Sequence, residues 1–149
     1  MNTKKYLIAG ALALTMSAPA MAQEVNYAKA LEPITAALKA APNDPKAAKD
    51  LIKEYQKTFK KDEEAIVALG NVYLLQHNFT EAEALANSVI NNKKFNGSKA
   101  YVLLGDIAAI QDSIGNAGAA AQQYQTAISL DPHNVTAYER YAKVYRHVN

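Results

Sequence analysis

The stretch Tyr101-Val102-Leu103-Leu104-Gly105-Asp106-Ile107-Ala108 decides the fold, because its central pair of a large and a small residue occurs three times in the chain. Leu69-Gly70 is the first occurrence, Leu104-Gly105 the second and Tyr141-Ala142 the third. The small residues of these pairs stand 35 and 37 positions apart. A repeat of that length indicates a chain built from similar helical units.

The segments around these pairs have the pattern of helices separated by short turns. Apolar residues recur at three- and four-residue spacing from Gln23 onward, which is typical of helices that bury one face. Proline, glycine and asparagine mark the expected turns, which are Pro42-Asn43-Asp44-Pro45, Asn96-Gly97, Gly115 to Gly118 and Asp131-Pro132. The sequence therefore predicts an all-α fold.

Helix packing explains why each pair contains a small residue. It lets a neighbouring helix approach closely, while the large residue fills the space beside that contact. Each hairpin of two helices then keeps apolar surface that only the next hairpin can cover. Burying one Leu or Tyr side chain stabilises the fold by about 1.5–3 kcal/mol, so a single hairpin cannot offset the chain entropy lost on folding. The hairpins are therefore expected to fold together as a stack.

The copy from Tyr101 to Pro132 resembles the tetratricopeptide repeat (TPR). That repeat has a large residue, Leu-Gly and Tyr in its first helix, and Ala, an aromatic residue, Ala and Pro in its second. Leu104-Gly105 matches the first helix, Ala108 stands where tyrosine is usual, and three extra residues lengthen the turn around 112–116. The matching residues of the second helix are Ala120, Tyr124, Ala127 and Pro132.

The resemblance implies both the fold and the class of function. The implied fold is all-α, with antiparallel helix-turn-helix repeats stacked into a right-handed α-solenoid. Its units would be a degenerate pair at about 25–61, repeats at about 63–96 and 98–134, and the first helix of a further, truncated repeat at 135–149. In this family the exposed side of each first helix lines a concave groove that binds a partner. By position these residues are Val67, Asn71, Leu74, Leu75, Lys99, Val102, Asp106, Ala109, Glu139, Lys143 and Arg146.

Some members of the family clamp the terminal carboxylate of a partner with Lys, Asn and Arg from successive first helices. Asn71 and Arg140 occupy matching positions here. The other clamp positions hold Val67, Leu103 and Thr136, so the clamp is incomplete. The resemblance therefore implies a protein or peptide partner without identifying it.

Residues 1–22 have the three parts of a secretory signal peptide. Lys4 and Lys5 form a basic head, an apolar run continues to Met16, and Ala20-Met21-Ala22 provides the small residues of a cleavage site. The apolar run is shorter than the roughly 20 residues that cross a bilayer. We expect cleavage after Ala22, export to the periplasm or cell envelope, and no stable membrane insertion of the mature chain, residues 23–149. The chain has no cysteine to carry a lipid, so a lipoprotein is not expected.

The net charge of +2 comes from the leader. Without Lys4 and Lys5, 14 basic residues stand against 14 acidic ones. A neutral chain without a basic stripe is not expected to bind nucleic acid. The absence of cysteine also excludes disulfides, so apolar burial must hold the fold together.

Five lysines follow helical spacing between residues 46 and 60. They are Lys46, Lys49, Lys53, Lys57 and Lys60, and the opposite face carries Leu51, Ile52, Tyr55 and Phe59. We interpret the lysines as a solvated helix face, with a stripe that binds anions or a membrane as the alternative.

The sequence shows no constellation that would support catalysis, a metal or a cofactor. His77, His133 and His147 form no pair with metal-ligand spacing. Gly115-Asn116-Ala117-Gly118 follows no predicted strand, so it is interpreted as a turn and not as a phosphate loop. Glu63-Glu64 is interpreted as a pair of first-turn acids favoured by the helix dipole. We therefore expect a non-catalytic interaction scaffold of the bacterial cell envelope that binds a peptide or protein in its groove.

Several alternatives remain open at this point. The last helix is interpreted as the start of a truncated repeat, with a solvating cap helix as its alternative. If the array is truncated, the chain would be the N-terminal TPR segment of a larger envelope enzyme or assembly factor. Tyr138, Tyr141, Tyr145 and Val148 share one face of the last helix, which allows self-association through that helix. Asp112-Ser113-Ile114 is interpreted as a polar turn, with glycosylation of Ser113 as its alternative.

Overall fold

The computed structural model describes residues 19–111 and 117–148 of the chain. These residues form helices joined by short turns and contain no strand, which confirms the all-α prediction. The helices are α2 (Pro19–Ala40), α3 (Lys49–Thr58), α4 (Glu63–Leu75), α5 (Phe79–Ile90), α6 (Ser98–Gln111), α7 (Ala117–Leu130) and α8 (Val135–Val148).

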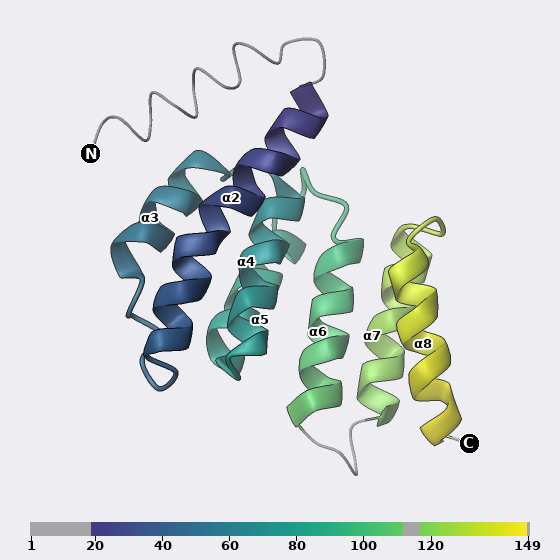
Figure 1. Cartoon of the computed structure of the whole chain (residues 1–149). Coiled ribbons are helices and arrows are strands. Elements are labelled where there is room, and N and C mark those ends of the chain that lie inside the picture. The colour runs from purple at the N-terminus through teal and green to yellow at the C-terminus, as the bar shows by residue number, and fades with distance from the viewer. Residues whose placement is uncertain (1–18, 112–116, 149) are drawn as a thin grey trace.

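The helices pack in two rows. In the first row, α2 contacts α4, α4 contacts α6 and α6 contacts α8. The second row contains α5, which packs against both α4 and α6, and α7, which packs against both α6 and α8. Figure 1 shows α4 in front of α5 and the pair α6 and α7 next to them, with α8 at the C-terminal end of the stack. Helix α3 packs against α2 at the opposite end.

Local signals explain where the helices begin and end. Asp62 caps α4, because its Oδ1 accepts a hydrogen bond from the backbone N–H of Ala65 at 3.1 Å. Helix α4 ends just before His77, whose φ of 57° lies in the left-handed region and turns the chain into α5. Gly97 adopts a φ of 86° immediately before α6, a conformation that glycine reaches without strain.

The core lies between the two rows. Of the large residues of the three pairs, Leu69 is buried, whereas Leu104 and Tyr141 are only partly buried. Leu69, Leu103 and Tyr124 are almost completely buried. The close approach predicted at two small residues is present, since a Cβ on Gly70 would overlap the side chain of Leu103, and a Cβ on Gly105 would overlap the ring of Tyr124. Ala142, the third small residue, is exposed, because none of the described helices covers its face of α8.

Polar bonds fix the C-terminal end of the stack. The Ser98 hydroxyl at the start of α6 donates to the carbonyl of Ala127 in α7 at 2.7 Å, and it accepts from the Asn134 amide before α8 at 2.9 Å. The Asn96 amide donates to the carbonyl of Leu130 at 3.0 Å. The start of α6, the end of α7 and the start of α8 are therefore tied together.

Several sequence predictions need correction. Leu51 is 41% exposed and does not share the buried face of α3, because only Ile52, Tyr55 and Phe59 point into the core. Lys46 and Lys60 lie just outside α3. Ala117 and Gly118 form the start of α7 and are not part of the predicted turn.

Glu63 has a role that the sequence did not predict. Its carboxylate accepts hydrogen bonds from the backbone N–H groups of Asn96 (3.1 Å) and Gly97 (2.7 Å), so it holds the turn between α5 and α6.

Two predictions fall largely outside the described residues. The leader, residues 1–22, is described only from residue 19, where α2 begins. The lengthened turn at 112–116, including Ser113, also lies outside the described residues.

Candidate functional site

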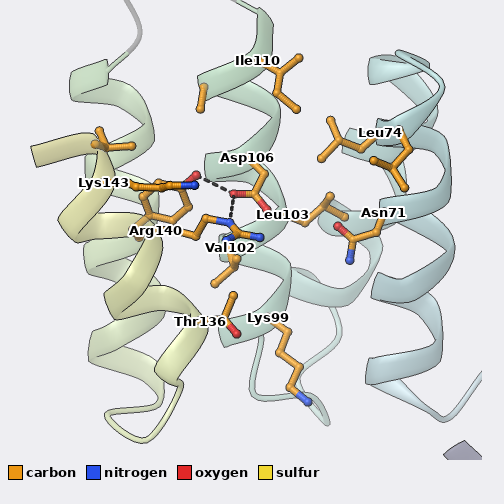
Figure 2. A pocket seen from close by; sticks show the side chains of 14 residues that line it. Asn71, Leu74, Lys99, Val102, Leu103, Asp106, Ile110, Thr136, Arg140 and Lys143 are labelled. Atoms are coloured by element: carbon orange, nitrogen blue, oxygen red, sulfur yellow. Dashed lines mark hydrogen bonds and ion pairs between the residues drawn. The ribbon is translucent and has the colours of Figure 1, made fainter. Parts of the chain in front are cut away.

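The first row of helices carries a groove. Its main hollow has a volume of about 530 Å³ and lies between α4, α6 and α8, with one tyrosine from α7 at its base. Figure 2 shows side chains of the three helices around this hollow. The lining residues are Asn71, Leu74, Leu75, Lys99, Val102, Leu103, Asp106, Ala109, Ile110, Tyr124, Thr136, Arg140, Lys143 and Val144.

A second hollow of about 300 Å³ adjoins the first and extends it toward α2. The two hollows share the lining residues Asn71, Lys99, Val102 and Thr136. Tyr27 of α2 and Glu64 and Val67 of α4 line the second hollow. The groove therefore crosses all four helices of the first row.

Most of the residues predicted to line a groove come together in these two hollows. Eight of them line the main hollow, namely Asn71, Leu74, Leu75, Lys99, Val102, Asp106, Ala109 and Lys143. Val67 lines the second hollow. Glu139 and Arg146 line neither hollow and are exposed on another side of α8.

Helix α8 turns a different face to the groove from the one predicted. Thr136, Arg140 and Lys143 point into the main hollow, with the spacing of four and three residues that one helix face requires. The resemblance to the tetratricopeptide repeat already places Thr136 and Arg140 at two positions of the carboxylate clamp. The repeat offset of 37 residues, which relates Thr136 to Lys99 and Arg140 to Leu103, indicates the same face of α8.

A partly buried polar network links α6, α7 and α8 at the base of the groove. The Asp106 carboxylate accepts a hydrogen bond from the Tyr124 hydroxyl at 2.6 Å and another from Arg140 Nε at 3.1 Å. Both bonds are drawn in Figure 2. Burial, followed by the hydrogen bond to Asp106, raises the pKa of Tyr124, so the phenol stays protonated and remains a donor. Asp106 therefore positions Arg140 in the groove wall.

The groove combines exposed apolar side chains with hydrogen-bonding groups. Leu75 is 74% exposed and Ile110 is 48% exposed at one end of the main hollow. Lys99 forms an ion pair with Glu64 at 2.8 Å, and both partners are about half-exposed. The arrangement can therefore contact apolar side chains and also hydrogen-bond to polar groups of a bound chain.

The described residues show neither a metal centre nor a spanning segment. Within residues 19–111 and 117–148, no three His, Cys, Asp or Glu side chains lie close enough to hold a metal ion. His77 and His133 are both exposed. None of the helices that the structure describes has the length and the apolar character needed to cross a membrane.

No protein-family model and no curated protein matches the chain. The functional conclusion therefore rests on the repeat residues and on the groove.

Proposed function

We propose that this chain is an exported, TPR-like scaffold of the bacterial cell envelope, and that it binds a peptide or an extended protein segment in the groove along α2, α4, α6 and α8. The observation that carries the proposal is the continuity of the groove, since its two hollows share four lining residues. The three copies of the large-small pair support the TPR-like assignment and the right-handed stacking that it implies.

The dimensions of the groove suit an extended segment. Neighbouring helix axes lie roughly 8–10 Å apart, so four helices in a row span about 27 Å. An extended chain advances about 3.3 Å per residue, and about eight residues would therefore cross the groove. Leu75 and Ile110 would receive apolar side chains of this segment, while Asn71, Thr136 and Lys143 would contact its polar groups.

In this proposal the protein binds and does not catalyse. Neither hollow is lined by a histidine or a serine, and the chain has no cysteine, so the usual nucleophile and base pairs are missing from the lining. The carboxylate of the main hollow, Asp106, is occupied by Tyr124 and Arg140.

Site-specific photocrosslinking in bacterial cells that export the protein tests the proposal. A photoreactive amino acid replaces Leu75 or Ile110 in the groove, and the matched control replaces Leu51, an exposed leucine on α3. We expect both groove positions to capture the same protein, with little capture from position 51. A capture that is equally strong from position 51, or none from either groove position, would contradict the proposal.

A second substitution identifies the groove as the cause of capture. Lys143→Glu reverses a charge in the wall, and Lys53→Glu makes the same change on the exposed side of α3. We expect the first variant to weaken capture at position 75 and the second to leave it unchanged.

Signal-peptide cleavage and export are tested separately by measuring the intact mass of the exported protein. We expect a mature protein that begins at Gln23. A chain that keeps residues 1–22 would contradict cleavage and would favour a membrane anchor.

A further inference from the structure

Helix α8 carries an exposed apolar stripe that the groove does not use. Val135 is 66% exposed, Tyr138 is 47% exposed and Tyr145 is 49% exposed. Ala142 is also exposed and lies between the two tyrosines. We call these four residues the α8 stripe. Their spacing of three, four and three residues is that of a seam between two paired helices.

The same face is covered by another helix in the two preceding repeats. On α4, Ala82 and Leu85 of α5 lie within 4 Å of the position that a Cβ of Gly70 would take. On α6, Tyr124 of α7 lies against Gly105. Ala142 is the third residue of this series, and its face remains uncovered within the described residues. The stripe is therefore a helix-packing face without its helix.

The residue at the centre of the stripe restricts what can cover it. Tyr124 approaches Gly105 so closely that a Cβ there would lie 2.7 Å from the ring carbon Cδ1. Ala142 carries that Cβ, so it excludes an occupant seated as closely as α7 is on α6. It suits a helix at the ordinary spacing of about 8–10 Å.

Two charged residues of opposite sign flank the stripe on one edge. Glu139 and Arg146 are both exposed and stand two turns apart on α8. When two copies of α8 run antiparallel about a two-fold axis, Glu139 of one copy lies beside Arg146 of the other, and the contact is made twice. A parallel pair would keep the two Glu139 residues level and would separate each from Arg146 by two turns. The charges therefore complement the same helix in the antiparallel direction.

We propose that the α8 stripe is a dimerisation surface whose occupant is the α8 stripe of a second copy of this chain. The two helices run antiparallel, Tyr145 of each copy packs on Ala142 of the other, and the Glu139 and Arg146 pairs set the register. Tyr145 is already stacked on Tyr141, with ring centroids 5.8 Å apart, so its side chain loses little freedom on pairing. Thr136, Arg140 and Lys143 face the groove, which the dimer leaves open.

The experiment is a charge exchange on the full chain, measured by sedimentation equilibrium up to about 0.5 mM, a range that detects weak dimers. Glu139→Arg places arginine opposite Arg146, and Arg146→Glu places glutamate opposite Glu139. We expect each single variant to raise the dimer dissociation constant about ten-fold or more. The double variant E139R/R146E should return it to within about three-fold of the original value. An equimolar mixture of the two single variants should form a heterodimer.

Control measurements separate a change at the dimer interface from a loss of fold and from association through another part of the chain. Both positions are exposed, so all variants should keep the helical circular-dichroism spectrum of the original chain. Association through the apolar leader would be the same in every variant, whereas the expected pattern depends on the charges at positions 139 and 146. A control exchange, Lys53→Glu on α3, should leave the dissociation constant unchanged.

Three outcomes would overturn the proposal. The chain could remain monomeric over the whole range, which would show that the stripe does not bind a second copy of this chain. It could dimerise equally well in both single variants, which would place the interface elsewhere. It could also fail to recover in the double variant, which would exclude the antiparallel register.

Discussion

At the scale of single residues, Gly105 shows how closely two helices of the stack approach. An added Cβ would lie 2.8 Å from Cζ of Tyr124 and nearer still to two other carbons of the ring, Cδ1 and Cε1. The ring is 1% exposed and its hydroxyl is bonded to Asp106, so it cannot move aside easily. Alanine is the better helix former by about 1 kcal/mol, but the overlap opposes that gain and should exceed it.

We expect Gly105→Ala to lower the free energy of unfolding by about 1–3 kcal/mol, because the core around Tyr124 would be overpacked. Urea denaturation measures the effect. Gly118→Ala in α7 is the control, since a Cβ there meets nothing within 4 Å. Gly118 lies in the first turn of α7, so that variant should not lower the free energy of unfolding and should raise it by less than about 0.5–1 kcal/mol, the gain in the middle of a helix. A Gly105→Ala variant as stable as the original chain would contradict the packing argument.

Two buried tyrosines should make the fold sensitive to alkali. Burial, more than the nearby Tyr27 and Asp62, raises the pKa of Tyr55, whose hydroxyl donates to the carbonyl of Ala65 at 2.6 Å. Burial and the bond to Asp106 raise the pKa of Tyr124. Each folded-state pKa lies above the ordinary value of 10.0, so the stabilising contribution is complete below pH 10 and is lost as the pH rises further.

We therefore expect the free energy of unfolding to fall above about pH 10, by about 1.4 kcal/mol per pH unit for each such tyrosine. Tyr124→Phe should reduce this slope by about that amount, although it also removes one hydrogen bond at every pH. Urea denaturation across the alkaline range, with tyrosinate absorbance as a second readout, checks the prediction. An unchanged slope in Tyr124→Phe would contradict it.

At the scale of elements, the turn between α5 and α6 is held by the first residue of α4. Glu63 accepts two backbone N–H groups of this turn, which lie 33 and 34 residues further along the chain. Its neighbour Glu64 instead forms the half-exposed ion pair with Lys99. Charge-assisted bonds to backbone donors are stronger than exposed ion pairs, so the two adjacent glutamates should differ in their contribution to stability.

We expect Glu63→Ala to lower the free energy of unfolding by about 1.5–3 kcal/mol, because two backbone donors lose a charged acceptor. Glu64→Ala, the adjacent control, should lower it by less than about 1 kcal/mol. Thermal or urea denaturation compares the two variants. Equal effects would show that the turn does not depend on Glu63.

At the scale of the whole molecule, burial is unequal along the stack. Helix α4 has seven buried residues, whereas the only residue of α8 in the buried core, within the described part of the chain, is Ala137. The core is also divided into a large cluster from α2 to α6 and a smaller one around α6, α7 and α8. The C-terminal end should therefore open more readily than the middle.

We expect backbone amides of α8 to exchange with solvent hydrogen faster than those of α4. Their protection factors should be lower by about ten-fold or more. Hydrogen exchange followed by mass spectrometry measures this at protein concentrations low enough to keep the chain monomeric. Equal protection of the two helices would indicate that the stack opens as one cooperative unit.

The all-α fold could be predicted because its signals are periodic. The pairs Leu69-Gly70 and Leu104-Gly105 mark equivalent positions, and the structure places both glycines at close helix contacts. The groove residues of α4 and α6 were implied by the resemblance to the tetratricopeptide repeat, and they line the two hollows. Of the residues of α8 that line the groove, only Lys143 was in the predicted lining. The groove face of α8 is polar and lies opposite its tyrosines, so the apolar pattern does not mark it. The role of Glu63 could not be predicted either, since a bond between distant segments leaves no periodic trace.

The position of the α8 stripe, on a different face of the helix from the groove wall, affects how strongly the molecule could bind. A dimer formed through the stripe would present two open grooves on one particle. A target with two recognition segments, or two neighbouring targets on one surface, would then be bound bivalently. Avidity of this kind can exceed the affinity of a single site by about 10²–10⁴-fold without any additional contact in the groove.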